Sequence, residues 1–203
     1  GAGKLHHVGA PARKEKKMSF KDKIVALKEK EKQVIERAYA QTPVEYHGYI
    51  LLLEQNLKVS NAALEINDEL KSMGVYANNG KTYLSQQVPY MTVDGRIAMA
   101  VDEALKKGTQ IEIGAPEFHE VNQKLICNVT VKTARGIATG TAKVGIGGGG
   151  VDLSNPFENA QTSAIGRALG FQGYGLIGTG VASAEEVAFA LKEQSNALTP
   201  NSE

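Results

Sequence analysis

The residues best suited to chemistry in this chain are cations set among hydroxyl side chains in its second half. Lysine and arginine neutralise phosphates, and serine, threonine and backbone amides donate hydrogen bonds to phosphate oxygens without reading bases. Aromatic side chains can stack on bases. We therefore predict a surface that binds a nucleic-acid strand. Its phosphate contacts would come from Arg96, Lys132, Arg135, Lys143, Thr162, Ser163 and Arg167, and its base stacking from Tyr90, Phe171 and Tyr174.

Plainer interpretations stay open for the same residues. The lysines could belong to a solvated sheet face, and the aromatic residues could serve the core or a subunit interface.

Other chemistries have weaker support. Residues 145–150 contain the spacing GxGxxG, but the preceding strand belongs to an expected antiparallel meander and the next helix begins too late to hold a pyrophosphate. Residues 80–82, GKT, lack the glycine spacing of a phosphate-binding loop. His47 and His119 have no metal-ligand spacing. We expect no catalytic residue, cofactor or metal; a small nucleotide-binding enzyme using residues 145–150 is the remaining enzymatic alternative.

Charge and cysteine content limit the classes of protein to which this chain can belong. Residues 1–17 resemble a tag or vector remnant before Met18. Without them, 23 basic and 22 acidic residues become 18 and 21, so the net charge moves from +1 to −3. A nucleic-acid site must then be a local patch. The single cysteine, Cys127, excludes a disulfide framework and is typical of a buried thiol. No apolar run reaches the roughly 20 residues of a membrane span, and we expect a cytoplasmic protein without membrane contact.

The cations must be positioned by a helix that begins near Asn155. Asn155 as the cap, Pro156 in the first turn and Glu158 at capping-box spacing predict this start. Winding the helix at about 100° per residue separates two faces. The packing face would carry Phe157, Ala160, Ala164, Ile165, Ala168 and Leu169, and the opposite face Thr162, Ser163, Gly166 and Arg167.

Three strands are expected before this helix, at residues 111–121, 124–132 and 137–146. With residues 133–136 as the loop, one register gives the last two strands an apolar and a polar face. On the apolar face it pairs Leu125 with Val144, Cys127 with Ala142 and Val131 with Ala138. On the other face it pairs Ile126 with Lys143, Asn128 with Thr141, Thr130 with Thr139 and Lys132 with Ile137. The apolar face should rest on helices, and residues 145–150 should form a flexible linker.

The remaining elements complete an α+β fold, an antiparallel three-stranded β-meander flanked by helices. Amino-terminal helices are expected at residues 19–40, 44–57 and 60–72, although residues 49–53 could instead be a strand. A small hairpin is expected around the Asn-Asn-Gly turn of residues 75–85, and a helix at 96–106. The domain division is a helical region at 18–74, a core at 75–183, and a carboxy-terminal helix with a flexible tail at 184–203.

Two motifs flank the meander: YMTVDGRIAMAVDEA at residues 90–104 and TSAIGRALGFQGYG at residues 162–175. This order, covering a bit under half of the chain, resembles the core of the single-strand annealing proteins related to eukaryotic Rad fifty-two, a group that includes the phage ERF and Sak types. The resemblance implies that Arg167 falls on a basic position of the family's groove helix. Gly166 stands where eukaryotic members often have lysine, and Arg96 falls near a basic position of the first core helix.

The resemblance also implies a function. It predicts ATP-independent binding of single-stranded DNA and annealing of complementary strands in homologous recombination and repair, by an oligomeric ring or filament. Such a phage, plasmid or bacterial recombinase would bind single-stranded DNA and itself, could work with an exonuclease or a single-strand-binding protein, and would be cytoplasmic in a bacterial host. The first alternative is a coating protein that protects single strands without annealing them.

Overall fold

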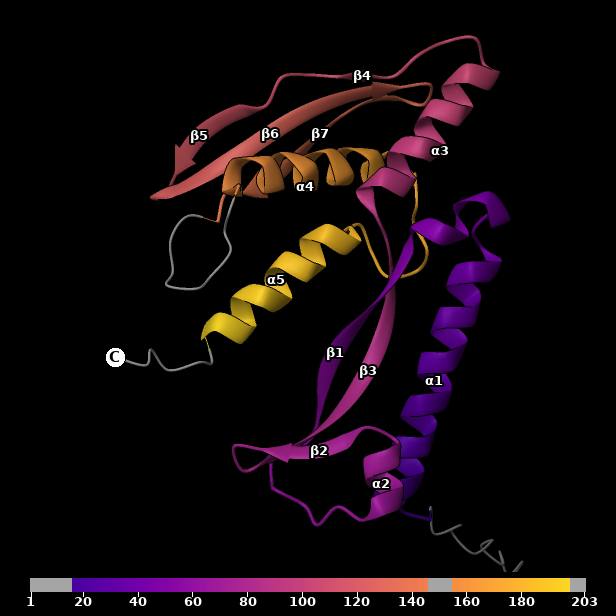
Figure 1. The fold of residues 1–203 in the computed structure, drawn as a ribbon, viewed down its shortest axis with the longest axis vertical. Helices are drawn as coiled ribbons and strands as arrows, with labels where there is room; N and C mark the ends of the chain where they lie inside the picture. The colour runs from indigo at the N-terminus through magenta and orange to yellow at the C-terminus, as the bar shows by residue number, and fades with distance from the viewer. Residues whose placement is uncertain (1–15, 146–154, 198–203) are drawn as a thin grey trace, which may run out of the picture.

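The protein is described by a computed structural model of residues 16–145 and 155–197, which has an α+β fold with two antiparallel sheets (Figure 1). The long strand pair β1–β3 runs along the molecule, and helix α1 lies beside it (Figure 1). At one end of this pair lies the second sheet, with α4 packed against β6 and β7 (Figure 1). Most of the predicted leader, most of the predicted glycine linker and the last six residues of the predicted tail lie outside the described residues.

The first sheet has three strands in the order β1-β3-β2: β1 (Ile50–Ser60), β2 (Val75–Asn78) and β3 (Lys81–Met91). The predicted hairpin is confirmed. Asn79 and Gly80 turn the chain between β2 and β3 at positive φ, 48° and 71°, a conformation that these residue types accept. Beyond the hairpin, β3 pairs with β1, and Leu53 lies opposite Val88.

The amphipathic amino-terminal helix is confirmed as α1 (Phe20–Ala40). Ser19 caps it, because its hydroxyl accepts a hydrogen bond from the Asp22 N–H at 3.1 Å. The helix packs along β3 and buries Ile24 against Leu84. This contact ties the amino-terminal helix to the first sheet.

The predicted helix at residues 44–57 is wrong. A short 3-10 helix, η1 (Val44–Tyr49), leads directly into β1, in agreement with the alternative of a strand at residues 49–53. The second half of β3 extends past β2, and its backbone N–H and C=O groups need partners. The apolar run in β1 supplies them. A run this short does not distinguish a strand from a helix by periodicity.

The predicted helix at residues 60–72 is also wrong over most of its length. Only α2 (Asp68–Ser72) is helical, and the Asn67 side chain caps it. The buried hydroxyl of Thr82 on β3 donates to one backbone carbonyl of the preceding segment and accepts from the Leu64 N–H at 3.0 Å. These bonds hold the segment against the sheet.

The second sheet has four strands: β4 (Glu112–Ile113), β5 (Glu117–Val121), β6 (Lys124–Thr133) and β7 (Gly136–Lys143). The predicted register is confirmed, since Cys127 lies opposite Ala142 and Thr130 opposite Thr139. The predicted first strand is divided into β4 and β5, which both pair with β6. Pro116 lies between them and has no N–H for the ladder.

The apolar face of this sheet rests on α4 (Pro156–Phe171), as predicted. Val129 and Val131 are fully buried there with Ala164 and Leu169. At Gly140 the helix is so close that a Cβ would lie 1.8 Å from the Ala164 carbonyl oxygen. The close approach of helix and sheet therefore requires glycine at this position.

The predicted capping of α4 is wrong although its position is right. Asn155 has a left-handed backbone, φ 69° and ψ 52°, and its side chain makes no capping hydrogen bond. A side-chain cap requires an extended backbone at the cap residue, so that its oxygen reaches the free N–H groups of the first turn. Asn155 contributes only its carbonyl, which accepts from the Asn159 N–H at 3.0 Å.

Two further helices complete the described fold. α3 (Val93–Lys106) begins three residues before the predicted start, because the Thr92 hydroxyl caps it by accepting from the Gly95 N–H. α5 (Ala184–Ala197) confirms the predicted carboxy-terminal helix. It lies between α4 and the β1–β3 pair (Figure 1).

Candidate nucleic-acid interface

Four of the predicted contact residues meet at one cleft where β7, α4 and α5 come together. We call it the Arg167 cleft; its volume is about 380 Å³. It is lined by Thr141, Ala142 and Lys143 from β7, by Ser163, Arg167 and Phe171 from α4, and by Glu186, Phe189, Ala190 and Glu193 from α5. β7 pairs only with β6 among the described residues, so its last residues lie at the sheet edge and reach the cleft.

Arg167 is the central cation of this cleft. Its Nη1 donates to the Glu186 carboxylate at 3.1 Å, and its guanidinium carbon lies 5.4 Å from the centre of the Phe171 ring. The side chain is 32% exposed, so it is not sealed from solvent. An arginine held beside an aromatic ring can contact a phosphate while the ring faces a base.

Lys143 is the second cation, at the end of β7. Its side chain is exposed, and within residues 16–145 and 155–197 that side chain makes no hydrogen bond or ion pair. Phe171 is 54% exposed and available for stacking. Ser163, however, is only 5% exposed, and Gly166 is buried against Val93. The face of α4 predicted to be open is therefore partly covered by α3 and α5.

Lys132 lies on a different surface. On the outer face of the second sheet, opposite α4, hydroxyl and amide side chains pair across β6 and β7. The Thr130 and Thr139 hydroxyls are 2.7 Å apart, and the Thr141 hydroxyl donates to Asn128 at the same distance. Lys132 continues this row and forms an ion pair with Glu112 at 3.6 Å. Most of the polar sheet face thus lies on the side opposite to Arg167, and only its last residues on β7, Thr141 and Lys143, also line the Arg167 cleft at the sheet edge.

The prediction that Arg96 contacts DNA is contradicted by its burial: the side chain is 1% exposed. Its Nη1 donates to the carbonyls of Gly166 at 2.6 Å and Val181 at 2.7 Å. Burial lowers the pKa of Arg96 to about 10, while Glu186 acts in the opposite direction, so the guanidinium stays charged at neutral pH. Arg96 joins α3 to α4 and to the segment before α5.

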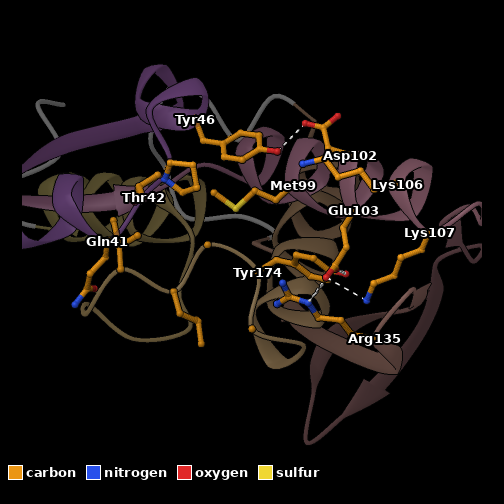
Figure 2. A pocket seen from close by; sticks show the side chains of 15 residues that line it. Gln41, Thr42, Tyr46, Met99, Asp102, Glu103, Lys106, Lys107, Arg135 and Tyr174 are labelled. Atoms are coloured by element: carbon orange, nitrogen blue, oxygen red, sulfur yellow. Dashed lines mark hydrogen bonds and ion pairs between the residues drawn. The ribbon is translucent and has the colours of Figure 1, made fainter.

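Arg135 and Tyr174 belong to a second cleft of about 550 Å³ (Figure 2). Arg135 donates through Nε to Glu103 at 3.0 Å and lies 4.0 Å over the Tyr174 ring. The Tyr174 hydroxyl donates to the same carboxylate, and this bond, together with Arg135, holds the pKa of Glu103 below its usual value. Burial and that hydrogen bond raise the pKa of Tyr174.

Base stacking by Tyr174 and Tyr90 is contradicted by their positions. Tyr174 is 1% exposed and Tyr90 is 8% exposed. The Tyr90 hydroxyl accepts from the Gln55 side-chain amide at 2.8 Å. Both rings serve the core, which was the open alternative. Thr162, by contrast, is partly exposed on α4 but does not line the Arg167 cleft.

Several residues at these clefts had no sequence signal for the positions they occupy. Tyr46 and Asp102, joined by a 2.7 Å hydrogen bond, line the far side of the second cleft (Figure 2). This bond is the largest cause that raises the pKa of Tyr46 to about 12. Glu186 and Glu193 are ordinary helix residues by sequence. Only the docking of α5 brings Glu186 to Arg167 and Glu193 into the lining of the same cleft.

Some chemistries have no support in the part of the chain that the structure describes. There, no group of three or more His, Cys, Asp or Glu side chains could hold a metal ion. The described helices include none with the length and apolar character needed to span a membrane. Most of the GxGxxG segment lies outside the described residues.

Comparisons of the chain with protein-family models, with curated proteins and with solved structures find no match.

Proposed function

We propose that this protein binds single-stranded DNA without base specificity through the Arg167 cleft, and that it anneals complementary strands without ATP as a homo-oligomer in recombination. The observation that carries the proposal is the meeting of Arg167, Lys143 and Phe171 at one surface cleft. Two cations can neutralise successive phosphates, and an exposed ring can stack on any base. This combination suits sequence-independent binding of a strand.

The order of elements supports the resemblance to annealing proteins. α3 precedes the meander of β5, β6 and β7, and α4 follows it and packs against its apolar face. Annealing needs repeated phosphate contacts that reduce the repulsion between strands and leave base edges free. The cationic side chains of the Arg167 cleft would make phosphate contacts of this kind.

Exposed strand edges support self-association. Among the described residues, β1 and β7 each pair on one side only. Leu51 and Leu57 on β1 are 46% and 40% exposed, and Ile137 on β7 is 68% exposed. Unpaired edges with apolar side chains favour contact with another chain. An oligomer would repeat the cleft along a strand longer than one subunit can hold.

The binding test compares Lys143→Ala, Arg167→Ala and the double variant with the wild type, all without residues 1–17. Removing that leader matters because it carries five lysine and arginine residues. Anisotropy of a labelled oligothymidine over a salt series reports affinity and its salt dependence. We expect the double variant to bind more weakly, with a salt slope smaller by about 0.7 for each lost phosphate contact. Lys32→Ala, on the exposed face of α1, is the matched control and should leave binding unchanged.

The annealing test mixes two complementary labelled oligonucleotides without nucleotide and follows duplex formation by energy transfer. Accelerated pairing by an oligomer, seen by light scattering of the same samples, is the expected result. Binding without acceleration would instead identify a coating protein. Unchanged binding by the double variant would contradict the Arg167 cleft as the site.

A further inference from the structure

We propose that α5 is an acidic cover that competes with DNA phosphates for the Arg167 cleft. This inference rests on the proposed function and adds its regulation. In the structure, Glu186 of α5 already occupies one side of the Arg167 guanidinium at 3.1 Å. Glu193, two helical turns later, lines the same cleft. The carboxylates take the place that phosphates would need.

The charges of the cleft balance in this arrangement. Its lining includes two cations, Lys143 and Arg167, and two anions, Glu186 and Glu193. A phosphate that approaches the covered cleft meets no net positive charge. When the Glu186 side chain turns away and the later part of α5 with Glu193 leaves the cleft, the two cations remain on β7 and α4 without the carboxylates. Strand binding and the release of α5 are therefore coupled, because a DNA phosphate and the Glu186 carboxylate compete for the same guanidinium.

The Glu186 contact is incomplete, which favours its release. One carboxylate oxygen, Oε1, pairs with Arg167, but Oε2 is buried with no hydrogen-bond partner. A buried carboxylate oxygen without a partner costs free energy that water would recover once the group is exposed. The ion pair itself is 32% exposed on both sides, and such pairs contribute little to stability. Turning the Glu186 side chain away from Arg167 therefore exchanges a weak contact for a hydrated carboxylate.

The attachment of α5 fits a hinge at its start. Ser183 and Ala184 are fully buried, and the Ser183 hydroxyl accepts from the Glu186 N–H. Glu185 accepts from the Val93 N–H at 2.9 Å and so ties the first turn to α3. From Ala190 onward most of the described side chains of α5 are exposed. The first turn, which includes Glu186, can stay anchored while the Glu186 side chain turns away from Arg167 and the helix from Phe189 onward leaves the cleft.

The test neutralises the carboxylates without changing their shape. Glu186→Gln, Glu193→Gln and the double variant are compared with the wild type by anisotropy of a labelled oligothymidine, without residues 1–17. We expect each change to tighten binding, and Glu186→Gln to do so about two- to fivefold, the range that a partly exposed ion pair contributes. Glu36→Gln on α1 makes the same change in net charge far from the cleft and should have no effect.

Repeating Glu186→Gln in the Arg167→Ala background tests whether the gain acts through Arg167. Under the proposal the gain disappears there, and hydrogen exchange of residues 187–195 in the wild type speeds up when the oligonucleotide binds. An equal gain from Glu36→Gln, a gain that persists without Arg167, or slower exchange of α5 with DNA would each overturn the cover.

The failure of the cover and of the proposed function can be told apart. If the wild type binds and both glutamine variants bind with the same affinity, the cover is wrong and the binding site stands. If only the glutamine variants bind, α5 closes the site as proposed. If no form binds, both proposals are wrong. Glu193→Gln keeps the test valid even if Glu186→Gln lowers stability, because Glu193 is exposed.

Discussion

Arg96 should govern stability rather than DNA binding, and Arg96→Met tests this. Methionine keeps an unbranched apolar side chain but removes the guanidinium. In the structure, Nη1 donates to the carbonyls of Gly166 and Val181 at 2.6 and 2.7 Å, and Nη2 lies 3.4 Å from the Ala182 carbonyl. Because Arg96 is 1% exposed, the substitution removes these donors from the carbonyls at a site that excludes water.

The expected cost follows from the two short bonds. A hydrogen bond from a charged donor contributes about 1.5–3 kcal/mol. Burial of the guanidinium, which also lowers its pKa to about 10, offsets part of the sum. We expect Arg96→Met to reduce the free energy of unfolding by about 3 kcal/mol. With a urea dependence of about 2 kcal/mol per M, the unfolding midpoint falls by about 1.5 M.

Urea unfolding followed by circular dichroism measures this shift. Arg37→Met, at an exposed position of α1, is the matched control and should change stability by no more than about 0.5 kcal/mol. A midpoint for Arg96→Met within about 0.3 M of the wild type would refute the reasoning. Loss of oligothymidine binding with an unchanged midpoint would return Arg96 to the contact surface.

Two other perturbations probe the fold around the clefts. Gly140→Ala should lower the free energy of unfolding by about 3 kcal/mol or more, because its Cβ would collide with the Ala164 carbonyl. The control Thr139→Ala, at the neighbouring residue, should lower it by less than about 1 kcal/mol. Equal urea midpoints for the two variants would contradict the close packing of α4 on β7. Tyr46 should ionise near pH 12, because its neutral hydroxyl donates to Asp102. The stabilisation of the folded state by this hydrogen bond is therefore present below pH 10 and lost as the pH rises through 12. Asp102→Asn should return this pKa towards 10 in an ultraviolet titration, with Tyr46→Phe identifying the signal; an unchanged value would rule out the hydrogen bond as its cause.

The second sheet shows how much local pattern can determine. The alternation of Cys127, Val129 and Val131 with polar residues identified both faces of β6, and only one register matched them to β7. The glycine turn at residues 79–80 and the extent of α1 followed from equally local signals. These features depend on residues that are neighbours in sequence or lie across one short loop, so a pattern a few residues long contains the physical cause.

The first sheet could not be predicted from local pattern alone, because its strands β1 and β3 are far apart along the chain. The apolar run of β1 is compatible with a helix or a strand, and β3 selects the strand by offering an unpaired edge about 35 residues later. The predicted side-chain cap of α4 failed because of the backbone conformation at the cap residue. Asn155 is a favourable cap by type, but the backbone takes a left-handed conformation there.

The features of the candidate site also divide into those that local sequence determines and those that depend on distant segments. The sequence by itself determined which residues are cations, and it placed Lys143 on a strand and Arg167 on the helix that follows it. Tertiary structure alone decided which cations face solvent. Arg96 binds carbonyls 70 and 85 residues further along the chain, and Arg167 meets an acid 19 residues later on α5. The charge of a side chain is a property of its type, whereas its burial and its partner depend on how distant segments dock, because desolvation is set by everything packed around the group.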